Sequence, residues 1–130
     1  VLEAMAGPTI EFAGRLSDQE VADAFARCRG LIFPGEEDFG IAPLEANASG
    51  RPVVAYAAGG ALDTVVDGLS GVHFHEQTVE ALCAAVARCD ATAWDSAAIR
   101  RHAEGFSEAR FRERFTAVVE QALQARPVRA

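Results

Sequence analysis

The pattern of apolar and polar positions alternates between short apolar runs and longer amphipathic segments. Apolar, β-rich runs predict strands at residues 9–14, 31–33, 51–57 and 72–74. Amphipathic segments predict helices at residues 1–6, 17–28, 41–49, 62–65, 78–88, 94–104 and 107–124. Strands that alternate with helices in this way build parallel βαβ units. The sequence therefore predicts an α/β fold with a doubly wound parallel sheet, in one domain over residues 1–130.

Residues that start and stop helices support these boundaries. Ser17 and Glu20 form an S-x-x-E capping box, and Ser107 is a further N-cap. Gly7, followed by Pro8, predicts a left-handed residue that ends the first helix. We interpret the apolar stripe of the last helix as core packing; it consists of Phe111, Phe115, Val118, Val119, Ala122 and Leu123.

Composition narrows the kinds of binding partner and the cellular location that we expect for this protein. Half of the 130 residues are apolar, which is enough for one core of ordinary size. The net charge of −7, with scattered arginines, argues against a nucleic-acid partner, which would require a contiguous basic patch. The sequence contains no 18-residue apolar run and no signal-peptide pattern. We therefore expect a cytoplasmic protein; peripheral contact with the inner face of the membrane in the full-length form is compatible with this.

The lack of lysine and the spacing of the cysteines limit the kinds of site that this segment can form by itself. All twelve cationic side chains are arginine, so a function that needs lysine must take it from outside this segment. The three cysteines, Cys28, Cys83 and Cys89, include no CxxC pair. We interpret them as buried or half-buried thiols rather than as metal ligands or a disulfide set.

The loop at residues 35–40 follows a predicted strand and precedes a predicted helix. In open parallel sheets, ligands bind beyond the carboxyl ends of the strands. The first amides of a helix lack intrahelical acceptors and carry the positive end of its dipole, so they can bind an anion without a cationic side chain. Gly40 is expected to let a ligand come close to the backbone. The amides in question belong to Phe39, Gly40, Ile41 and Ala42.

Carboxylates next to such an anion site require a second kind of ligand group. Phosphate alone would be repelled by Glu37 and Asp38, whereas sugar hydroxyls donate hydrogen bonds to carboxylates. A ligand with a central diphosphate and a sugar at each end would use the amides for phosphate, Glu37 for one sugar and Glu45 for the other. Such a ligand is a nucleotide sugar. Glu36 is interpreted as a solvated loop acid.

The residues around this loop resemble those of a known enzyme family. Residues 37–45 read EDFGIAPLE, with two glutamates separated by seven residues; FP precedes them, and ANASGRPVVA and GGALDTVVDGLSGVHF follow. The whole pattern resembles the retaining glycosyltransferases called group 1, or family four. The resemblance implies a GT-B enzyme with two Rossmann-like domains, of which this chain is an incomplete C-terminal, donor-binding domain. It also implies that the start of this domain and the acceptor domain lie outside the chain.

The resemblance assigns roles to individual residues. It implies that Glu37, the catalytic residue of this segment, contacts hydroxyls of the transferred sugar. It implies that Glu45 accepts from the ribose hydroxyls, that the amides around Gly40 and Ile41 hold the diphosphate, and that the base lies near residues 15–16. No metal or other cofactor is implied. The donor-binding set is Glu45, Asp38, Phe39, Gly40, Ile41, Ala42, Gly35, Arg15 and Leu16.

The expected activity is transfer of a hexosyl group, with retention, from a nucleotide-diphosphate sugar to an acceptor glycan or lipid. Mannose from GDP-mannose is favoured by the resemblance of the PGEEDFGI loop, and a UDP-sugar stays open as donor. The alternatives are a sugar-nucleotide epimerase or a phosphorylase of GT-B architecture, and a binding module without catalysis. Alone, the segment is expected to be inactive, and to self-associate through a bare sheet edge unless upstream residues cover that edge.

Two further patterns have both a structural and a functional interpretation. His73 and His75 alternate on a predicted strand, and we interpret them as structural histidines rather than metal ligands. Gly59 and Gly60 follow the carboxyl end of a strand on the same rim as the acidic loop. We expect these glycines to form a wall of the donor cleft rather than a plain turn.

Overall fold

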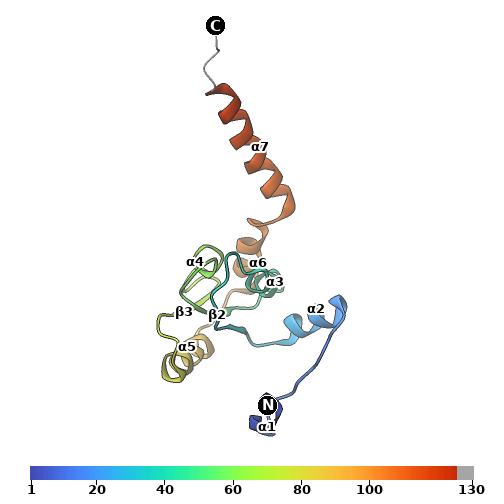
Figure 1. Ribbon diagram of the computed structural model, residues 1–130, viewed down its shortest axis with the longest axis vertical. Coiled ribbons are helices and arrows are strands. Elements are labelled where there is room, and N and C mark those ends of the chain that lie inside the picture. The colour runs from blue at the N-terminus through green and yellow to red at the C-terminus, as the bar shows by residue number, and fades with distance from the viewer. Residues whose placement is uncertain (126–130) are drawn as a thin grey trace.

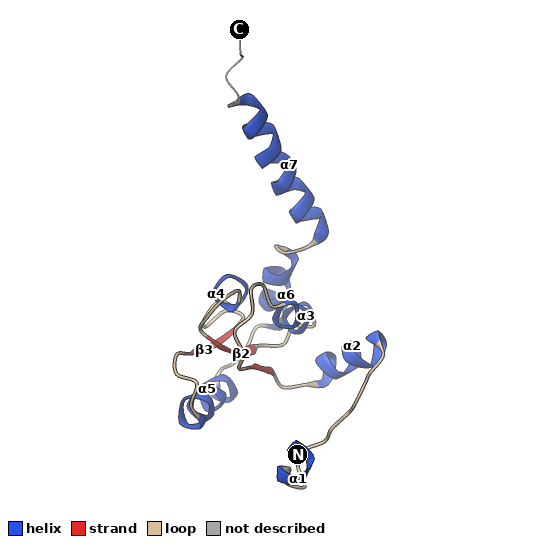
Figure 2. Cartoon of the chain, viewed as in Figure 1, coloured by secondary structure: helices blue, strands red, loops and turns tan. Residues whose placement is uncertain are grey.

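The computed structural model describes residues 1–125. Its strands form one parallel three-stranded sheet in the order β1-β2-β3, with β2 in the centre. Figures 1 and 2 show the sheet and its helices in the middle of the molecule, with α1 and α7 extending away from it in opposite directions. The elements are α1 (Leu2–Met5), α2 (Asp18–Arg27), β1 (Leu31–Phe33), α3 (Ile41–Ala48), β2 (Val53–Tyr56), α4 (Ala61–Thr64), β3 (Gly71–Phe74), α5 (Val79–Ala91), α6 (Ser96–Glu104) and α7 (Glu108–Gln124).

Helices cover both faces of the sheet, as the doubly wound prediction requires. Successive residues of β2 point to opposite faces. Val53 and Ala55 pack with Ala46 of α3 on one face, and Val54 packs with Ala85 of α5 on the other. Both faces of the central strand are therefore buried in apolar contacts, and the predicted α/β fold is confirmed.

Helix α6 supports α3. The two helices pack against each other, and Ile99 of α6 is completely buried. Asp95 caps the start of α6 by accepting from the amides of Ala97 and Ala98. The hydrogen bonds from the Ala98 and Ala97 amides lower the pKa of the Asp95 carboxyl, so the cap stays ionised at a lower pH than an ordinary aspartate would. Helix α3, which begins where the acidic loop ends, thus packs against both the sheet and α6.

The N-terminal capping signals in the sequence are confirmed. The Ser17 hydroxyl accepts from the Glu20 amide at 3.3 Å, and the Glu20 carboxylate accepts from the Ser17 amide at 2.8 Å. Ser107 caps α7 by accepting from the Arg110 amide. The strand predicted at residues 31–33 has the same bounds in the structure. Capping depends on residues that are neighbours in the chain, which explains why it could be predicted.

Residues 9–14 do not form the predicted strand. They run from α1 to α2 without regular structure, and Ile10 and Phe12 are 57% and 48% exposed. A β-rich run becomes a strand only where another strand supplies its hydrogen bonds and packing. Within residues 1–125 no strand lies beside this segment, which is far from the sheet in Figure 1. Gly7 also lacks the predicted left-handed conformation, because the chain leaves α1 in extended backbone at Ala6.

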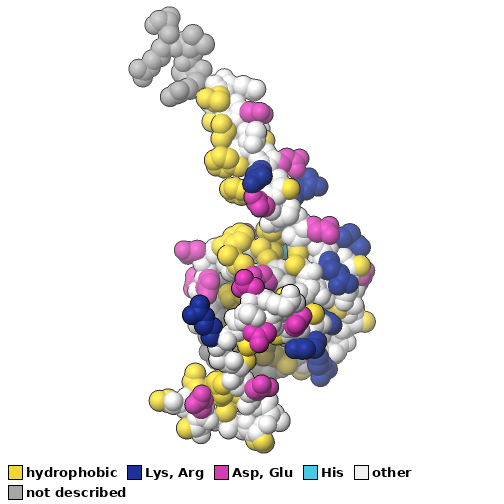
Figure 3. Space-filling model, turned by 90° about the vertical axis from the view of Figure 1, so that its right-hand side faces the viewer, with side chains coloured by type: hydrophobic (Ala, Val, Ile, Leu, Met, Phe, Trp, Pro, Cys, Tyr) yellow, Lys and Arg dark blue, Asp and Glu magenta, His cyan; other side chains and the backbone are white. Residues whose placement is uncertain are grey.

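The apolar stripe of α7 does not pack on the core, contrary to the prediction. Phe111 and Phe115 are 65% and 59% exposed, and Val118 and Leu123 are each 62% exposed. Figure 1 shows α7 projecting from the rest of the molecule, and Figure 3 shows hydrophobic side chains along one side of it. Helical periodicity correctly predicts the helix and its apolar face, but it does not say which surface covers that face.

The three cysteines differ in exposure. Cys89 is buried and Cys28 is half-buried, as expected, whereas Cys83 is exposed and corrects the prediction for that residue. Burial raises the pKa of the Cys89 thiol, and burial also shields it from reagents. The raised pKa keeps this group a neutral, unreactive thiol.

Alkylation of the native chain should therefore follow exposure. In a brief treatment with iodoacetamide at pH 8, we expect Cys83 to react first and Cys89 last, and peptide mass mapping reports the order. Addition of denaturant should make the three rates similar. If Cys89 reacted as fast as Cys83 without denaturant, the buried position of Cys89 would be wrong.

Candidate functional site

The acidic loop lies at the carboxyl edge of the sheet. Phe33 ends β1, residues 34–40 form the loop, and α3 begins at Ile41. The loop and the first turn of α3 border an open cavity of about 640 Å³, lined by Phe33, Glu36, Glu37, Asp38, Phe39, Gly40, Ile41 and Ala42. Open parallel sheets bind ligands at this edge. The structure thus brings together Glu37 and most of the predicted donor-binding residues.

The start of α3 offers amides that no side chain caps. Gly40 is the N-cap residue and makes no side-chain cap hydrogen bond. The first amides of a helix lack intrahelical acceptors and carry the positive end of the dipole. Pro43 has no N–H, so the amides that remain for a ligand here are those of Gly40, Ile41 and Ala42. Three such N–H groups can hold a phosphate without a cationic side chain.

Gly40 is required by the backbone rather than by a ligand. Its φ is 76°, in the left-handed region that favours glycine. A Cβ atom at this position would lie 3.4 Å from the ring of Phe33. This side of Gly40 faces the protein's own aromatic ring, and the approach of a ligand to the Gly40 backbone stays a prediction.

The carboxylates are placed to accept from neutral donors. Glu37 and Asp38 are exposed in the cavity lining. Glu45 is also exposed and lies outside the lining, but it follows Ile41 by four positions and Ala42 by three, so it shares their face of α3. Among residues 1–125, none of these carboxylates forms an ion pair. They are therefore free to accept hydrogen bonds from ligand hydroxyls.

Besides Glu45, three further members of the predicted donor set lie outside this cavity lining. Gly35 belongs to the loop and is exposed. Arg15 and Leu16 precede α2, and Leu16 lines a separate hollow with Ala13 and Arg27. The structure does not bring residues 15 and 16 to the acidic loop, and their position near a base stays a prediction.

The Gly59–Gly60 pair supports the loop from behind and does not line the cavity, contrary to the expectation of a cleft wall. A Cβ atom on Gly60 would lie 2.3 Å from the Phe39 carbonyl oxygen, and one on Gly59 would lie 2.3 Å from the Glu37 carbonyl oxygen. Only glycine permits this approach of two backbones.

Sequence reasoning missed Gln77, whose side chain reaches the Pro34 carbonyl at 3.0 Å. No local pattern in the sequence indicates a contact across 43 positions.

His73 makes a structural contact. It is half-buried in β3, and its Nε2 atom lies 3.3 Å from the carbonyl oxygen of Ala61. This contact joins β3 to α4 and supports the structural interpretation of this histidine. His75 lies beyond the end of β3 and is exposed.

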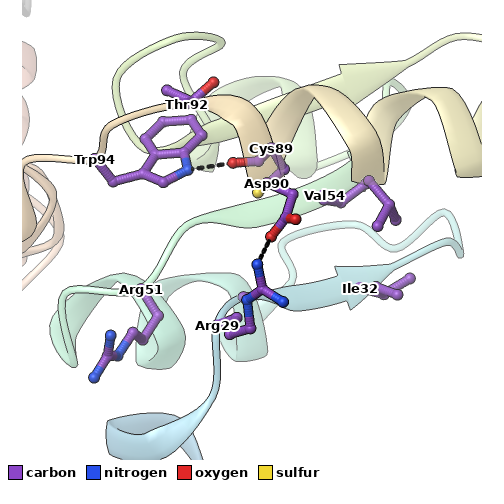
Figure 4. Close-up of a pocket in the computed structure, with 10 residues that line it drawn as sticks. Arg29, Ile32, Arg51, Val54, Cys89, Asp90, Thr92 and Trp94 are labelled. Atoms are coloured by element: carbon purple, nitrogen blue, oxygen red, sulfur yellow. Dashed lines mark hydrogen bonds and ion pairs between the residues drawn. The ribbon is translucent and has the colours of Figure 1, made fainter.

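A second cavity, of about 440 Å³, lies at the opposite edge of the sheet. Arg29 and Arg51 precede β1 and β2, so this cavity is at the amino ends of the strands. Figure 4 shows the Arg29 guanidinium paired with Asp90, and the Trp94 N–H donating to the Cys89 carbonyl. These polar groups already have protein partners. The loop at the carboxyl edge is therefore the better candidate for ligand binding.

Within residues 1–125, no helix is both long and apolar enough to cross a membrane.

The whole fold is shared with a known enzyme. Sucrose-phosphate synthase from Thermosynechococcus elongatus superimposes with a TM-score of 0.75 at 25% sequence identity, over 96% of this chain and 33% of that one. The chain thus corresponds to about one third of the solved protein.

Curated relatives with different substrates in their names are also similar. Sucrose synthase of Acidithiobacillus caldus is 34% identical over 84% of this chain. D-inositol 3-phosphate glycosyltransferase of Nocardioides sp. is 40% identical over 51% of it, and alpha-1,3/1,6-mannosyltransferase ALG2 of Dictyostelium discoideum is 53% identical over 34%. The chain covers 16%, 15% and 11% of these three proteins, respectively.

A family model matches well over half of the chain. The model described as "Glycosyl transferases group 1" matches residues 1–91. This range includes the acidic loop, α3, the central strand and β3. The chain belongs to the group 1 glycosyltransferases.

Proposed function

We propose that this chain is the donor-binding part of a retaining glycosyltransferase that transfers a hexosyl group from a nucleotide-diphosphate sugar. The observation that carries the proposal is the cavity at residues 33–42, where uncapped helix amides and unpaired carboxylates lie together. The amides suit a diphosphate, and the carboxylates suit sugar hydroxyls. A phosphate-only ligand would gain nothing from the carboxylates.

Each end of the donor has a proposed partner. Glu37, in the loop, accepts from hydroxyls of the transferred sugar. Glu45, further along the same face of α3, accepts from the two ribose hydroxyls. The diphosphate lies between them on the amides of Gly40 and Ile41. This order follows the order of the groups along the chain, from the loop into α3.

Mannose from GDP-mannose is the proposed donor, and a UDP-sugar is the alternative. The loop sequence supports mannose, and one relative is named a mannosyltransferase. Other relatives are named for sucrose and inositol phosphate, so the acceptor of this protein is a separate question. Titration of the complete protein with GDP, UDP and ADP tests the base, and we expect GDP to bind most tightly.

Glu45→Ala should weaken binding of the preferred nucleoside diphosphate in the complete protein. Loss of hydrogen bonds to a charged group costs about 1.5 to 3 kcal/mol, or roughly 10- to 150-fold in Kd. Isothermal titration calorimetry measures this change. The matched control is Glu120→Ala, which removes an exposed glutamate from the middle of α7. An unchanged Kd for Glu45→Ala would contradict the proposal that Glu45 accepts from the ribose hydroxyls.

A further inference from the structure

Two carbonyl groups of the acidic loop accept hydrogen bonds from the loops that follow β2 and β3. The Gly60 amide donates to the Glu37 carbonyl at 2.7 Å. The Nε2 atom of Gln77 donates to the Pro34 carbonyl at 3.0 Å. The contacts lie three positions apart, one where the loop leaves β1 and one at Glu37 itself. Neighbouring segments of the sheet edge thus hold the loop at two points.

The Gln77 contact depends on side-chain length. Gln77 follows β3, whereas Pro34 follows β1, and β2 lies between these strands. Adjacent strands are about 4.8 Å apart, so the contact spans roughly 10 Å of sheet. A terminal N–H on a two-methylene stem reaches this carbonyl, and asparagine would be one methylene short.

The chemistry of the contact is as informative as its length. Glu36, Glu37 and Asp38 are three consecutive carboxylates that repel one another. A lysine or arginine at position 77 would pair with these carboxylates and compete with ligand hydroxyls. A neutral amide instead donates to the backbone and leaves the carboxylates free. The contact therefore holds the loop without using its acceptors.

From this geometry we propose that Gln77 is a positioning residue for Glu37, acting through the Pro34 carbonyl to set how the loop presents the Glu37 carboxylate to the transferred sugar. The inference rests on the proposed function of this cavity. Gln77 is exposed and makes no apolar core contact, so its removal should change the loop and leave the fold intact. Gly60 provides the second support, through its backbone.

The test uses Gln77→Met, which keeps the length of the side chain and removes the donor. In the complete protein, calorimetry compares GDP with GDP-mannose and UDP with UDP-glucose. We expect the sugar nucleotide to bind about 2- to 10-fold more weakly, the equivalent of one ordinary hydrogen bond, while the nucleoside diphosphate changes less than about twofold. The control is Gln19→Met, which removes a comparable exposed hydrogen bond, to Asp23 on α2.

Two further readouts separate positioning from general stabilisation. Hydrogen exchange of peptides that cover residues 34–40 should accelerate in Gln77→Met and not in Gln19→Met. In the Glu37→Ala background, Gln77→Met should add no further loss of sugar-nucleotide binding, because the group that it positions is gone.

Three results would overturn the inference: unchanged sugar-nucleotide binding in Gln77→Met, equal losses for the nucleotide and its sugar, or full additivity with Glu37→Ala. Binding by the wild type together with an unaffected Gln77→Met would refute the positioning role alone. If the wild type bound none of the four nucleotides, the proposed function would fail and the inference would fail with it.

Discussion

Replacing Glu37 by alanine in the complete protein should lower the turnover number about 100-fold while the affinity for the nucleoside diphosphate stays within about twofold. The proposed partner of Glu37 is the transferred sugar, whose hydroxyls are absent from the nucleoside diphosphate. A hydrogen bond to a charged group is worth about 1.5 to 3 kcal/mol, and two such bonds to hydroxyls in the transition state explain an effect of this size. Release of nucleoside diphosphate measures turnover, and calorimetry measures affinity.

The neighbouring acid provides the control for this prediction. Glu36 has the same charge and exposure, and we interpret it as a solvated side chain. Glu36→Ala should therefore reduce turnover far less than Glu37→Ala. If Glu37→Ala and Glu45→Ala lost nucleotide binding equally, the assignment of one glutamate to the sugar and the other to the ribose would be wrong.

Ile99→Ala should destabilise the chain by about 2 to 5 kcal/mol, as deletion of a fully buried aliphatic side chain does. Ile99 is 0% exposed and lies on α6, which packs against α3. The loss combines reduced apolar burial with a cavity beside the helix that carries the candidate site. Urea unfolding followed by the fluorescence of Trp94, the single tryptophan, measures the change.

An exposed apolar residue provides the matching control. Val79 starts α5 and is 73% exposed, so Val79→Ala should change the free energy of unfolding by less than about 0.5 kcal/mol. If Ile99→Ala lowered the free energy of unfolding no more than Val79→Ala does, α6 would not pack on α3 as described.

The parts of the fold that depend on neighbours in the chain could be predicted from sequence. The Ser17–Glu20 capping box, the strand at residues 31–33 and the helix after Gly40 all follow from local spacing. The acidic loop could also be placed, because a strand, a loop and a helix in this order bring the loop to the carboxyl edge of the sheet.

The errors concern features that depend on contacts between residues far apart in the sequence. Residues 9–14 have β-rich composition, but no strand within residues 1–125 pairs with them. The stripe that includes Phe111 and Phe115 has the right period for an apolar face, yet within that same range no surface covers it. Gln77 contacts a residue 43 positions away, and the Gly59–Gly60 contact with the loop depends on how two backbones approach. Periodicity and propensity carry none of this information.

The central claim is that the acidic loop and the start of α3 hold the nucleotide sugar. A crystal structure of the complete protein with bound GDP-mannose, or with the UDP-sugar if UDP binds more tightly, tests it most directly. We expect the diphosphate on the amides of Gly40 and Ile41, the sugar hydroxyls on Glu37 and the ribose hydroxyls on Glu45. A donor bound instead at the amino ends of the strands, in the cavity between Arg29 and Trp94, would contradict the account.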